Sequence, residues 1–391
     1  MEIERLKSLV ISDVDAHSSE LFEIAHKIHA YPELGFQEKK ASGWLTGFLA
    51  EKGFKIERGI YGLETAFRAT YGKGKPVIAL LAEYDALPEL GHACGHNLIG
   101  TSSVGGAVGA RSAVDECGGK IEVIGTPAEE LYGGKVTMAQ RGAFTNLDVA
   151  MMVHPGGHDS VVTEALACQG ISVEFFGKAS HAAGRPEDGI NALEAMILSF
   201  NAIDALRQHI KSKARIHGII TDGGQAPNVV PAHSAGNFLV RASDEVYLTE
   251  LKEKVLNCFK GAAQATGARL EYEWDELSYA PMLNNLTLGH LFKDNMNRIG
   301  RKTRMVDPDK SFGSTDFGNV SQLVPGIHAS VSITTAIGTV THSPQFAEAA
   351  ISETGLHAML DAAKALGMTV ADLLTDSDIM AKVKAEFFRH K

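Results

Sequence analysis

The 391-residue sequence has no long apolar segment, no block of basic residues and only four cysteines. No run approaches the roughly 20 uninterrupted apolar residues of a membrane-spanning helix, which excludes a helical membrane protein. The charged N-terminus, MEIERLKSLVISDVD, lacks the apolar core of a signal peptide. The cysteines have no disulfide-framework spacing, so we expect a reducing, cytoplasmic location. They are Cys94, Cys117, Cys168 and Cys258.

The charge balance is acidic, with 37 Lys and Arg against 47 Asp and Glu and a net charge of −10. Such a chain is a poor candidate for binding nucleic acid through its phosphates. The apolar share of 45% is that of a globular protein, and the length suggests two or three domains. The 40 glycines gather in short runs beside His, Cys and Glu, where the backbone must turn tightly or approach something closely.

Strand-like and helix-like segments alternate in the first part of the chain. Apolar residues at three- and four-residue steps from Val10 to Ile28 predict one helix, which Pro32 ends. The later run VIALLAEYD is typical of a strand buried on both faces that delivers polar groups at its C-terminal end. Alternation of this kind predicts an α/β layer structure.

The pattern changes near residue 168 and returns near residue 280. Between these points the order strand–helix–strand–strand–helix–strand predicts a small α+β sandwich with an antiparallel sheet. We therefore expect one discontinuous α/β domain, residues 1–167 and 280–391, with a smaller domain, residues 168–279, inserted in it.

The motif HACGHN, residues 92–97, places Cys94 and His96 two apart between glycines. A short loop of this kind can point a thiolate and an imidazole at one cation, although a lone C-x-H is weak support. Asp85, at the end of the preceding buried strand, could orient a ligating imidazole. It could equally cap a helix or a turn.

Two further strands end in polar side chains. Glu129 and Glu130 follow the strand IEVIGTP, and by themselves they would suit a solvated turn. Beside a dication, one carboxylate can bind the metal while the other accepts a proton. His154 ends an apolar strand and His342 lies in the turn THSP; each alone would suit a structural role.

Together these residues predict a dimetal site. Strands that end near residues 85, 129 and 154 deliver their side chains to the crevice that forms at carboxyl ends in an open α/β sheet. The donors are more than one tetrahedral metal needs, so they suit two metals that share a bridge, and Cys94 is the expected bridge. The five donors are Cys94, His96, Glu130, His154 and His342.

Seven motifs in order resemble the dimetal amidohydrolases and peptidases that include aminoacylase and carboxypeptidase G. They are GHACGHN, GTPAEE, VHPG, ASHAAGRPEDGINAL, PNVVP, GSTDFGNVS and THSP, and the resemblance covers nearly the whole chain. The resemblance is nearest to the branch of p-aminobenzoyl-glutamate hydrolase and the aminoacylase-like dipeptidases. It implies a catalytic domain with a mixed sheet flanked by helices, interrupted by a dimerisation (lid) domain.

The resemblance also implies roles for single residues. The five donors match the family's metal ligands, and Glu129 matches its general base. One departure is the family's His-x-Asp strand motif, which here is Glu83-Tyr84-Asp85. A Cys/His centre takes the place of the usual first histidine.

The inserted domain has its own candidates. By resemblance, His181 stabilises the tetrahedral oxyanion in the partner subunit's active site, while Asn228 and Arg241 hold the substrate's carbonyl and carboxylate. By themselves, Asn228 could cap a turn and Arg241 could be a strand-edge residue. His217 could face the site or the sheet surface, and Asp316 lies near the site without an assigned role.

The function expected from the sequence is metal-dependent cleavage of the amide bond in N-acyl or aminobenzoyl amino acids, or in dipeptides, with a free carboxylate. The expected cofactors are two divalent ions, zinc first, with manganese and cobalt compatible. The expected partners are a small-molecule substrate and a second subunit, with neither nucleic acid nor membrane. The alternatives are an aminopeptidase-type dipeptidase that needs a free amine, and a catalytically silent dimeric metal-binding protein.

Overall fold

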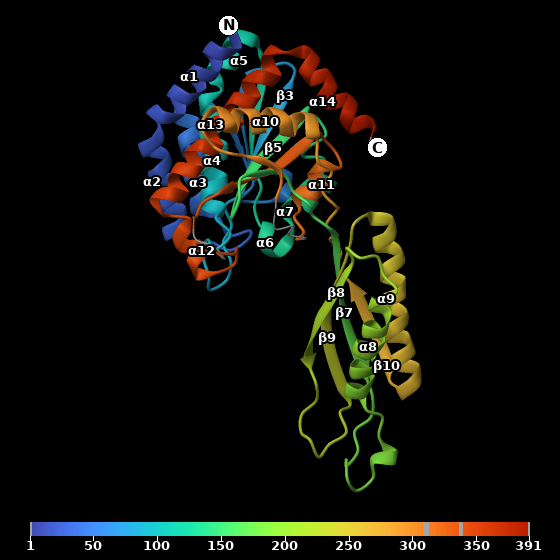
Figure 1. The fold of residues 1–391 in the computed structure, drawn as a ribbon. Coiled ribbons are helices and arrows are strands. Elements are labelled where there is room, and N and C mark those ends of the chain that lie inside the picture. The colour runs from blue at the N-terminus through green and yellow to red at the C-terminus, as the bar shows by residue number, and fades with distance from the viewer. Residues whose placement is uncertain (1, 308–312, 336–338, 390–391) are drawn as a thin grey trace. The chain divides into compact units, whose positions relative to one another are not determined.

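The computed structural model describes residues 2–307, 313–335 and 339–389, which fold into two compact units (Figure 1). The large unit comprises Met1–Glu164, Met282–Ser311 and Asn319–Lys391, and the small unit comprises Ala165–Pro281 and Phe312–Gly318. The predicted boundaries at 168 and 279 fall close to these limits. The segment 313–318 differs from the prediction: it was expected in the catalytic domain, and in the structure it groups with the small unit.

The large unit is built on a mixed sheet of eight strands, as predicted. Neighbouring strands β4, β3, β5 and β12 are parallel, while β1–β2, β2–β4 and β12–β6 pair antiparallel. All six residues of β3 are buried, so both faces of the sheet are covered there. In sheet order the strands are β1 (Lys55–Arg58), β2 (Phe67–Lys73), β4 (Gly119–Gly125), β3 (Val77–Ala82), β5 (Val149–Gly156), β12 (Gly326–Ser332), β6 (Ser160–Val162) and β11 (Arg304–Val306).

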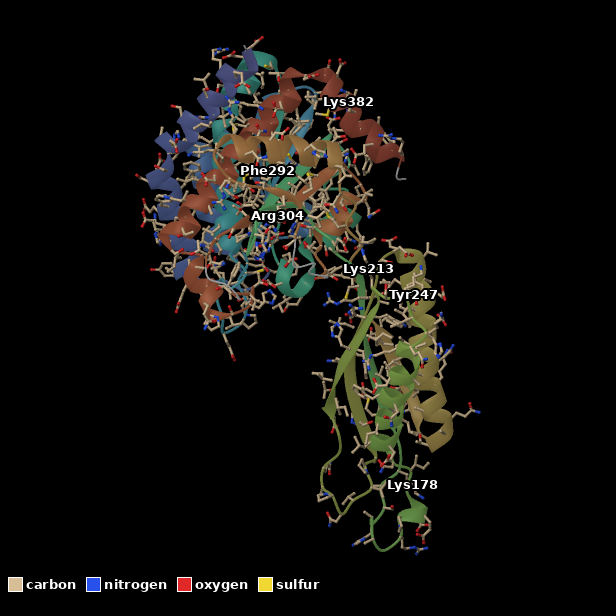
Figure 2. All side chains as sticks on the ribbon, in the orientation of Figure 1. Lys178, Lys213, Tyr247, Phe292, Arg304 and Lys382 are labelled. Atoms are coloured by element: carbon tan, nitrogen blue, oxygen red, sulfur yellow. The ribbon has the colours of Figure 1, made fainter. Side chains whose placement is uncertain are left out.

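Helices cover this sheet, and α4 is buried along its whole length. Its glycines allow α13 to approach closely: a Cβ on Gly106 would lie 2.9 Å from the carbonyl oxygen of Ala363. Phe292 of α10 is fully buried in the same core (Figure 2). The helices are α1 (Glu2–Ala16), α2 (Ser18–Ala30), α3 (Lys39–Glu51), α4 (His96–Gly109), α5 (Arg111–Cys117), α6 (Glu129–Tyr132), α7 (Gly134–Gln140), α10 (Leu286–Arg298), α11 (Phe317–Ser321), α12 (Pro344–Ala349), α13 (Glu353–Thr375) and α14 (Ser377–Arg389).

The single helix predicted at the start of the chain is in fact two helices, α1 and α2. They are separated at His17, whose backbone leaves the helical conformation at φ −101° and ψ 7°. The ring nitrogen Nδ1 of His17 lies 2.7 Å from the carbonyl oxygen of Asp13, an oxygen that the helical ladder also uses. None of the helices in the described parts of the chain combines the length and hydropathy needed to cross a membrane.

The small unit is a four-stranded antiparallel sheet that packs against two helices, in the predicted chain order (Figure 1). Alternate residues of β7, such as Ile171, Val173 and Phe175, form its core with residues of α8 and α9. The intervening residues lie on the opposite face of the sheet. The elements are β7 (Ala167–Phe176), α8 (Ala192–Arg207), β8 (Arg215–Asp222), β9 (His233–Ala242), α9 (Glu245–Thr266) and β10 (Arg269–Trp274), with sheet order β10-β7-β9-β8.

Candidate metal centre

The candidate site of the large unit lies at the carboxyl edge of its parallel strands. Asp85 follows β3, the pair Glu129-Glu130 opens α6 just after β4, and His154 lies in the last part of β5. Parallel neighbours end at the same edge of a sheet, so these segments meet there. The topology therefore explains why residues far apart in the sequence share one site.

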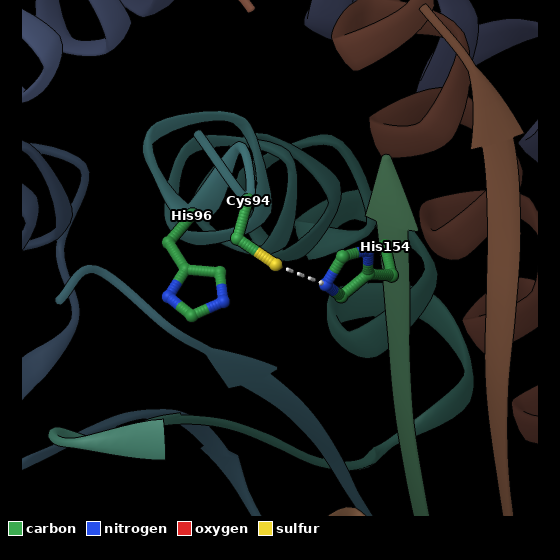
Figure 3. Close-up of side chains that lie close together, drawn as sticks. All are labelled: Cys94, His96 and His154. Atoms are coloured by element: carbon green, nitrogen blue, oxygen red, sulfur yellow. Dashed lines mark hydrogen bonds between the residues drawn. The ribbon is translucent and has the colours of Figure 1, made fainter. Parts of the chain in front are cut away.

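The loop between β3 and α4 brings Cys94 against β5. Gly95 takes φ +78°, and a Cβ at this position would lie 2.8 Å from Cγ of Pro155, so only glycine fits without a shift. This close approach places Sγ of Cys94 3.4 Å from Nε2 of His154. Figure 3 shows the thiol between the rings of His96 and His154, whose planes are nearly perpendicular at 89°.

Asp85 fixes the orientation of His96 and ties two segments together. Its Oδ1 lies 2.9 Å from Nδ1 of His96, and its Oδ2 accepts a hydrogen bond from the backbone N–H of Glu130 at 3.0 Å. Nε2 of His96 therefore faces the other donors. Burial opposes a charge on His96, but the carboxylate of Asp85 outweighs it and raises the pKa of this imidazole well above its usual value.

The turn before α6 stores backbone strain. Ala128 adopts φ +60°, a left-handed conformation that costs a non-glycine residue about 1–2 kcal/mol. The buried carboxylate of Glu38 holds this turn, because Oε1 accepts the N–H of Ala128 at 2.9 Å and Oε2 accepts the hydroxyl of Thr65 at 2.7 Å. Glu38 thus positions Glu129 and Glu130 from a distant part of the chain.

Glu38 should give the protein a measurable pH dependence. Burial raises its pKa from 4.5 to about 7, so between these values the folded state keeps a proton that the unfolded state has released. Stability from this group is present below about pH 4.5 and is lost as the pH rises through 7. We expect Glu38→Gln to gain stability relative to the parent between pH 5 and 8, by at most about 3 kcal/mol.

Urea unfolding of both proteins across this pH range measures the difference. Glu64→Gln, which changes an exposed carboxylate, is the matched control. If the difference in the free energy of unfolding between the parent and Glu38→Gln stayed constant with pH, the raised pKa of Glu38 would be contradicted.

Glu130 connects the donors on the two sides of the site. Its Oε1 lies 3.8 Å from Nε2 of His96 and its Oε2 lies 3.4 Å from Nε2 of His342. Burial alone would raise the pKa of Glu130, but His342 and His96 outweigh it and lower the pKa. The backbone N–H of His342 donates to the carbonyl oxygen of Ala93 at 2.8 Å, which anchors its loop beside Cys94.

The donor atoms form overlapping groups with Cys94 in common. One group joins Cys94, His96 and His154, and another joins Cys94, Glu130 and His342; within each group all donor atoms lie within 4.8 Å of one another. A third group joins His96, Glu129 and Glu130. Two groups of donors that share one thiol could hold two divalent ions.

The spacing and the chemistry of these atoms fit divalent ions. Two ligands of a tetrahedral ion stand about 3.4 Å apart when each lies about 2.1 Å from it, close to the donor separations here. Nε2 of His96 and Oε1 of Glu130 are buried and have no hydrogen-bond partner among the described residues. Buried polar atoms without partners are rare, and here they point at one another.

The pKa values of Cys94 and His154 indicate how many protons would leave if a cation bound at this site. Burial raises the pKa of the Cys94 thiol and lowers the pKa of His154. A cation bound here would therefore meet a neutral His154, whereas Cys94 would have to give up a proton to bind it.

Sequence reasoning missed four buried residues around these donors. They are Glu38, Glu83, Lys135 and His328. The ring of His328 stacks on that of His154 at 5.4 Å, and burial lowers the pKa of His328 to about 3. Of these four residues, only Glu83 could have been noticed in the sequence, because it takes the place of the histidine in the family's His-x-Asp strand motif.

In the small unit, His181 is exposed on the loop that follows β7. Its Nδ1 accepts hydrogen bonds from the backbone N–H groups of Gly184, at 3.0 Å, and Ala183, at 3.3 Å. Because Nδ1 is the acceptor, the neutral ring carries its proton on Nε2, which can donate outward. The backbone N–H of Ala182 donates to the carbonyl oxygen of Asn228 at 3.0 Å, so His181 and Asn228 lie on adjoining loops.

Arg241 and His217 lie at the other end of this sheet. The register places them as diagonal neighbours on the face that carries no helix, and Nη1 of Arg241 donates to the hydroxyl of Ser314 at 2.9 Å. Asn228 precedes the ten residues of β9, whereas Arg241 is the ninth of them. At about 3.4 Å per residue, roughly 30 Å of strand separates these two predicted substrate residues. Asp316 is fully buried.

Comparison with known proteins gives the family. The sequence model of Peptidase family M20/M25/M40 matches residues 79–387. The chain is 38% identical over 402 residues to the Xaa-Arg dipeptidase of Mus musculus, covering 99% of this chain and 93% of that protein. It is 29% identical to one of the subunits of the p-aminobenzoyl-glutamate hydrolase of Escherichia coli (strain K12), covering 95% of this chain and 93% of that protein.

A solved structure shares the fold. The Bacillus subtilis YXEP protein, described as a dinuclear metal-binding peptidase from the M20 family, has a TM-score of 0.67 and 22% identity. The match covers 89% of this chain and 98% of that one. The extent of these matches, together with the family model, shows that this chain belongs to Peptidase family M20/M25/M40 and is a hydrolase.

Proposed function

We propose that the protein uses two divalent ions to hydrolyse the amide bond of dipeptides, and of N-acyl amino acids, that carry a free carboxylate. The observation that carries this proposal is the pair of donor groups that share Cys94, with the carboxylate of Glu129 beside them. A purely structural metal site has no use for a further carboxylate at that place.

The proposed ligands are the five donors that converge in the large unit. When bound, the ions supply Lewis acidity and lower the pKa of a water molecule to about 7. The mixture of sulfur, nitrogen and oxygen donors suits zinc first, and manganese and cobalt accept the same set. The ligands are Cys94, His96, Glu130, His154 and His342.

Glu129 acts in this proposal as the general base. It lies at the N-terminus of α6, within 4.8 Å of donor atoms of His96 and Glu130, so a water beside those donors is within its reach. The carboxylate accepts the proton of the attacking water and passes it to the leaving amine. Asp85 acts through His96, whose ring it orients.

The substrate's polar groups are assigned to the small unit. Arg241 holds the carboxylate, because a guanidinium can grip it with two parallel hydrogen bonds, and His217 borders the same place. The outward Nε2–H of His181, with the amide of Asn228, binds the carbonyl oxygen as negative charge develops on it.

We propose a homodimer on two grounds. Asn228 and Arg241 stand at opposite ends of one sheet, so both can reach one substrate only if they come from different subunits. The edge strand β8 also exposes Ile219 and Ile220, at 63% and 42%. An open edge with exposed apolar side chains is suited to pairing with a second chain.

The names of the relatives suggest the first substrates to test. The Xaa-Arg dipeptidase has higher identity than the p-aminobenzoyl-glutamate hydrolase, so we place dipeptides with a C-terminal arginine ahead of aminobenzoyl amino acids.

A substrate panel tests the proposal. We expect the metal-loaded protein to cleave Gly-Arg, and the same dipeptide with an amidated C-terminus at least about tenfold more slowly, since a charge-assisted hydrogen bond contributes about 1.5–3 kcal/mol. The rates of hydrolysis of N-acetyl-arginine and of the free-amine dipeptide are then compared. Cleavage of N-acetyl-arginine indicates an acylase, whereas cleavage of the free-amine dipeptide alone indicates an aminopeptidase.

Chelation should abolish this activity while circular dichroism shows the fold retained, and added zinc should restore it. If the protein is shown to hold metal and still hydrolyses none of the dipeptides or acyl amino acids, the proposal is rejected. The protein would then be a catalytically silent metal-binding protein.

A further inference from the structure

A pocket lies on the face of the small unit's sheet that carries no helix. Its volume is about 400 Å³, and it is lined by β7, β8 and β9 together with the residue that follows β10. His217 and Leu239, which are paired across β8 and β9, both border it. None of the roles proposed above accounts for this pocket.

Asp275 supplies the negative charge of the pocket. Its backbone N–H donates to the carbonyl oxygen of Gly170 at 3.0 Å, which holds it against β7. The carboxylate lies over Gly170, because a Cβ on this glycine would overlap its Oδ2 atom. The residue is exposed, so a ligand can reach the carboxylate. Among the described residues that line the pocket, Asp275 is the only Asp or Glu.

Arg241 stands at the rim of the same pocket. It lies two residues beyond Leu239 on β9, so the two side chains are on one face of the sheet. Gly170 pairs with Leu239, which makes Arg241 and Gly170 diagonal neighbours, about 7–8 Å apart. Burial lowers the pKa of His217, and the positive charge of Arg241 lowers it further, as expected for side chains that lie close together.

The two charges match a ligand that has opposite charges in the same order. In the proposed function, Arg241 holds the carboxylate of the substrate's C-terminal residue. The side chain of that residue then has the pocket within reach. An extended arginine or lysine side chain spans the separation between Arg241 and Asp275, whereas an acidic side chain would be repelled by Asp275.

We propose that this pocket binds a cationic side chain at the C-terminus of the substrate and that Asp275 selects it, arginine ahead of lysine. A guanidinium can bond both oxygens of a carboxylate at once, whereas an ammonium acts as a point charge. This inference rests on the proposed function for the role of Arg241, and it names the substrate class of that site. Asp275 gives this chain a reason of its own, independent of the names of its relatives, to prefer C-terminal arginine.

The test compares the metal-loaded parent protein with Asp275→Asn and with the control Glu276→Gln. Glu276 is the next residue, is also exposed and does not line the pocket. The substrates are Gly-Arg, Gly-Lys, Gly-Glu and Gly-Met, the last being neutral and unbranched. The readout is the ratio of kcat/KM for Gly-Arg to kcat/KM for Gly-Met, because misfolding or loss of metal lowers both values together.

We expect the parent to prefer Gly-Arg and Gly-Lys to Gly-Met, and to cleave Gly-Glu most slowly. Asp275→Asn should lower the ratio of Gly-Arg to Gly-Met at least about tenfold, the usual effect of losing a charge-assisted hydrogen bond. Its hydrolysis of Gly-Met should stay close to that of the parent, and Glu276→Gln should keep the parent's ratio. Gly170→Ala, whose methyl group would displace the carboxylate of Asp275, should lower the same ratio.

The outcomes that contradict the inference differ from those that contradict the proposed function. An unchanged ratio in Asp275→Asn, equal losses on all substrates, or a parent that prefers Gly-Met would overturn the inference alone, because dipeptides would still be hydrolysed. If Asp275→Asn fails to fold, Gly170→Ala is judged by the same ratio. A metal-loaded parent that hydrolyses none of these dipeptides would reject the proposed function and this inference with it.

Discussion

Replacing Glu129 by glutamine is expected to lower kcat by about 10²- to 10⁴-fold while both ions stay bound. The amide keeps the size of the carboxylate and one of its oxygens, but it cannot accept the proton of the attacking water. Glu129 lies beside the donors at the start of α6 and belongs to neither of the two groups that share Cys94. Steady-state kinetics together with metal analysis of the purified variant measure both effects.

A carboxylate on the same edge of the sheet provides the control for this substitution. Glu89 is exposed on the loop between β3 and α4, and Glu89→Gln should have parent-like kcat. Turnover of Glu129→Gln within a few-fold of the parent would remove Glu129 from the mechanism, and loss of both ions would make it a ligand instead of a base.

Replacing His181 by alanine is expected to lower kcat by about 10²- to 10³-fold, the usual effect of removing one oxyanion donor. The backbone hydrogen bonds to Nδ1 leave Nε2–H as the donor, and alanine removes it. His209→Ala, which changes an exposed histidine of the same unit, is the control.

Mixing the two inactive variants tests whether one site uses two subunits. In a mixed dimer of His181→Ala and Glu129→Gln, one site has both the base and a partner's His181. Random exchange makes half of the dimers mixed, each with one intact site, so about a quarter of the parent activity should return. A mixture no more active than its components would place His181 and Glu129 in the same subunit or outside the mechanism.

The candidate site could be predicted because each of its residues lies in a short sequence motif that can be recognised by itself. Each donor lies in or just after a recognisable strand or in a short glycine-flanked motif, and the parallel topology then places the strand ends together. The order of strands and helices along the chain predicted the inserted α+β unit, and the family resemblance implied the mixed sheet; the structure confirms both. The ligand roles of the five donors stay a proposal, as does the choice of zinc.

What the sequence could not predict depends on contacts between distant segments. Glu38 supports Ala128 across 90 residues, and nothing in its neighbourhood distinguishes it from a solvated glutamate. The segment 313–318 joins the small unit because the N–H of Leu166 donates to Gly313 and the hydroxyl of Ser314 donates back to Leu166. The break at His17, whose ring nitrogen Nδ1 contacts the carbonyl oxygen of Asp13, leaves no mark in the apolar periodicity. The cytoplasmic location stays a prediction.

The most direct test of the account is the metal content of the parent and of Cys94→Ala, measured by elemental analysis after dialysis against buffer with limiting zinc. Cys94 belongs to both donor groups, so the account predicts two ions per parent chain and weakened binding of both in the variant. Two tightly held ions in Cys94→Ala, or none in the parent, would contradict the shared-thiolate centre on which the proposed function depends.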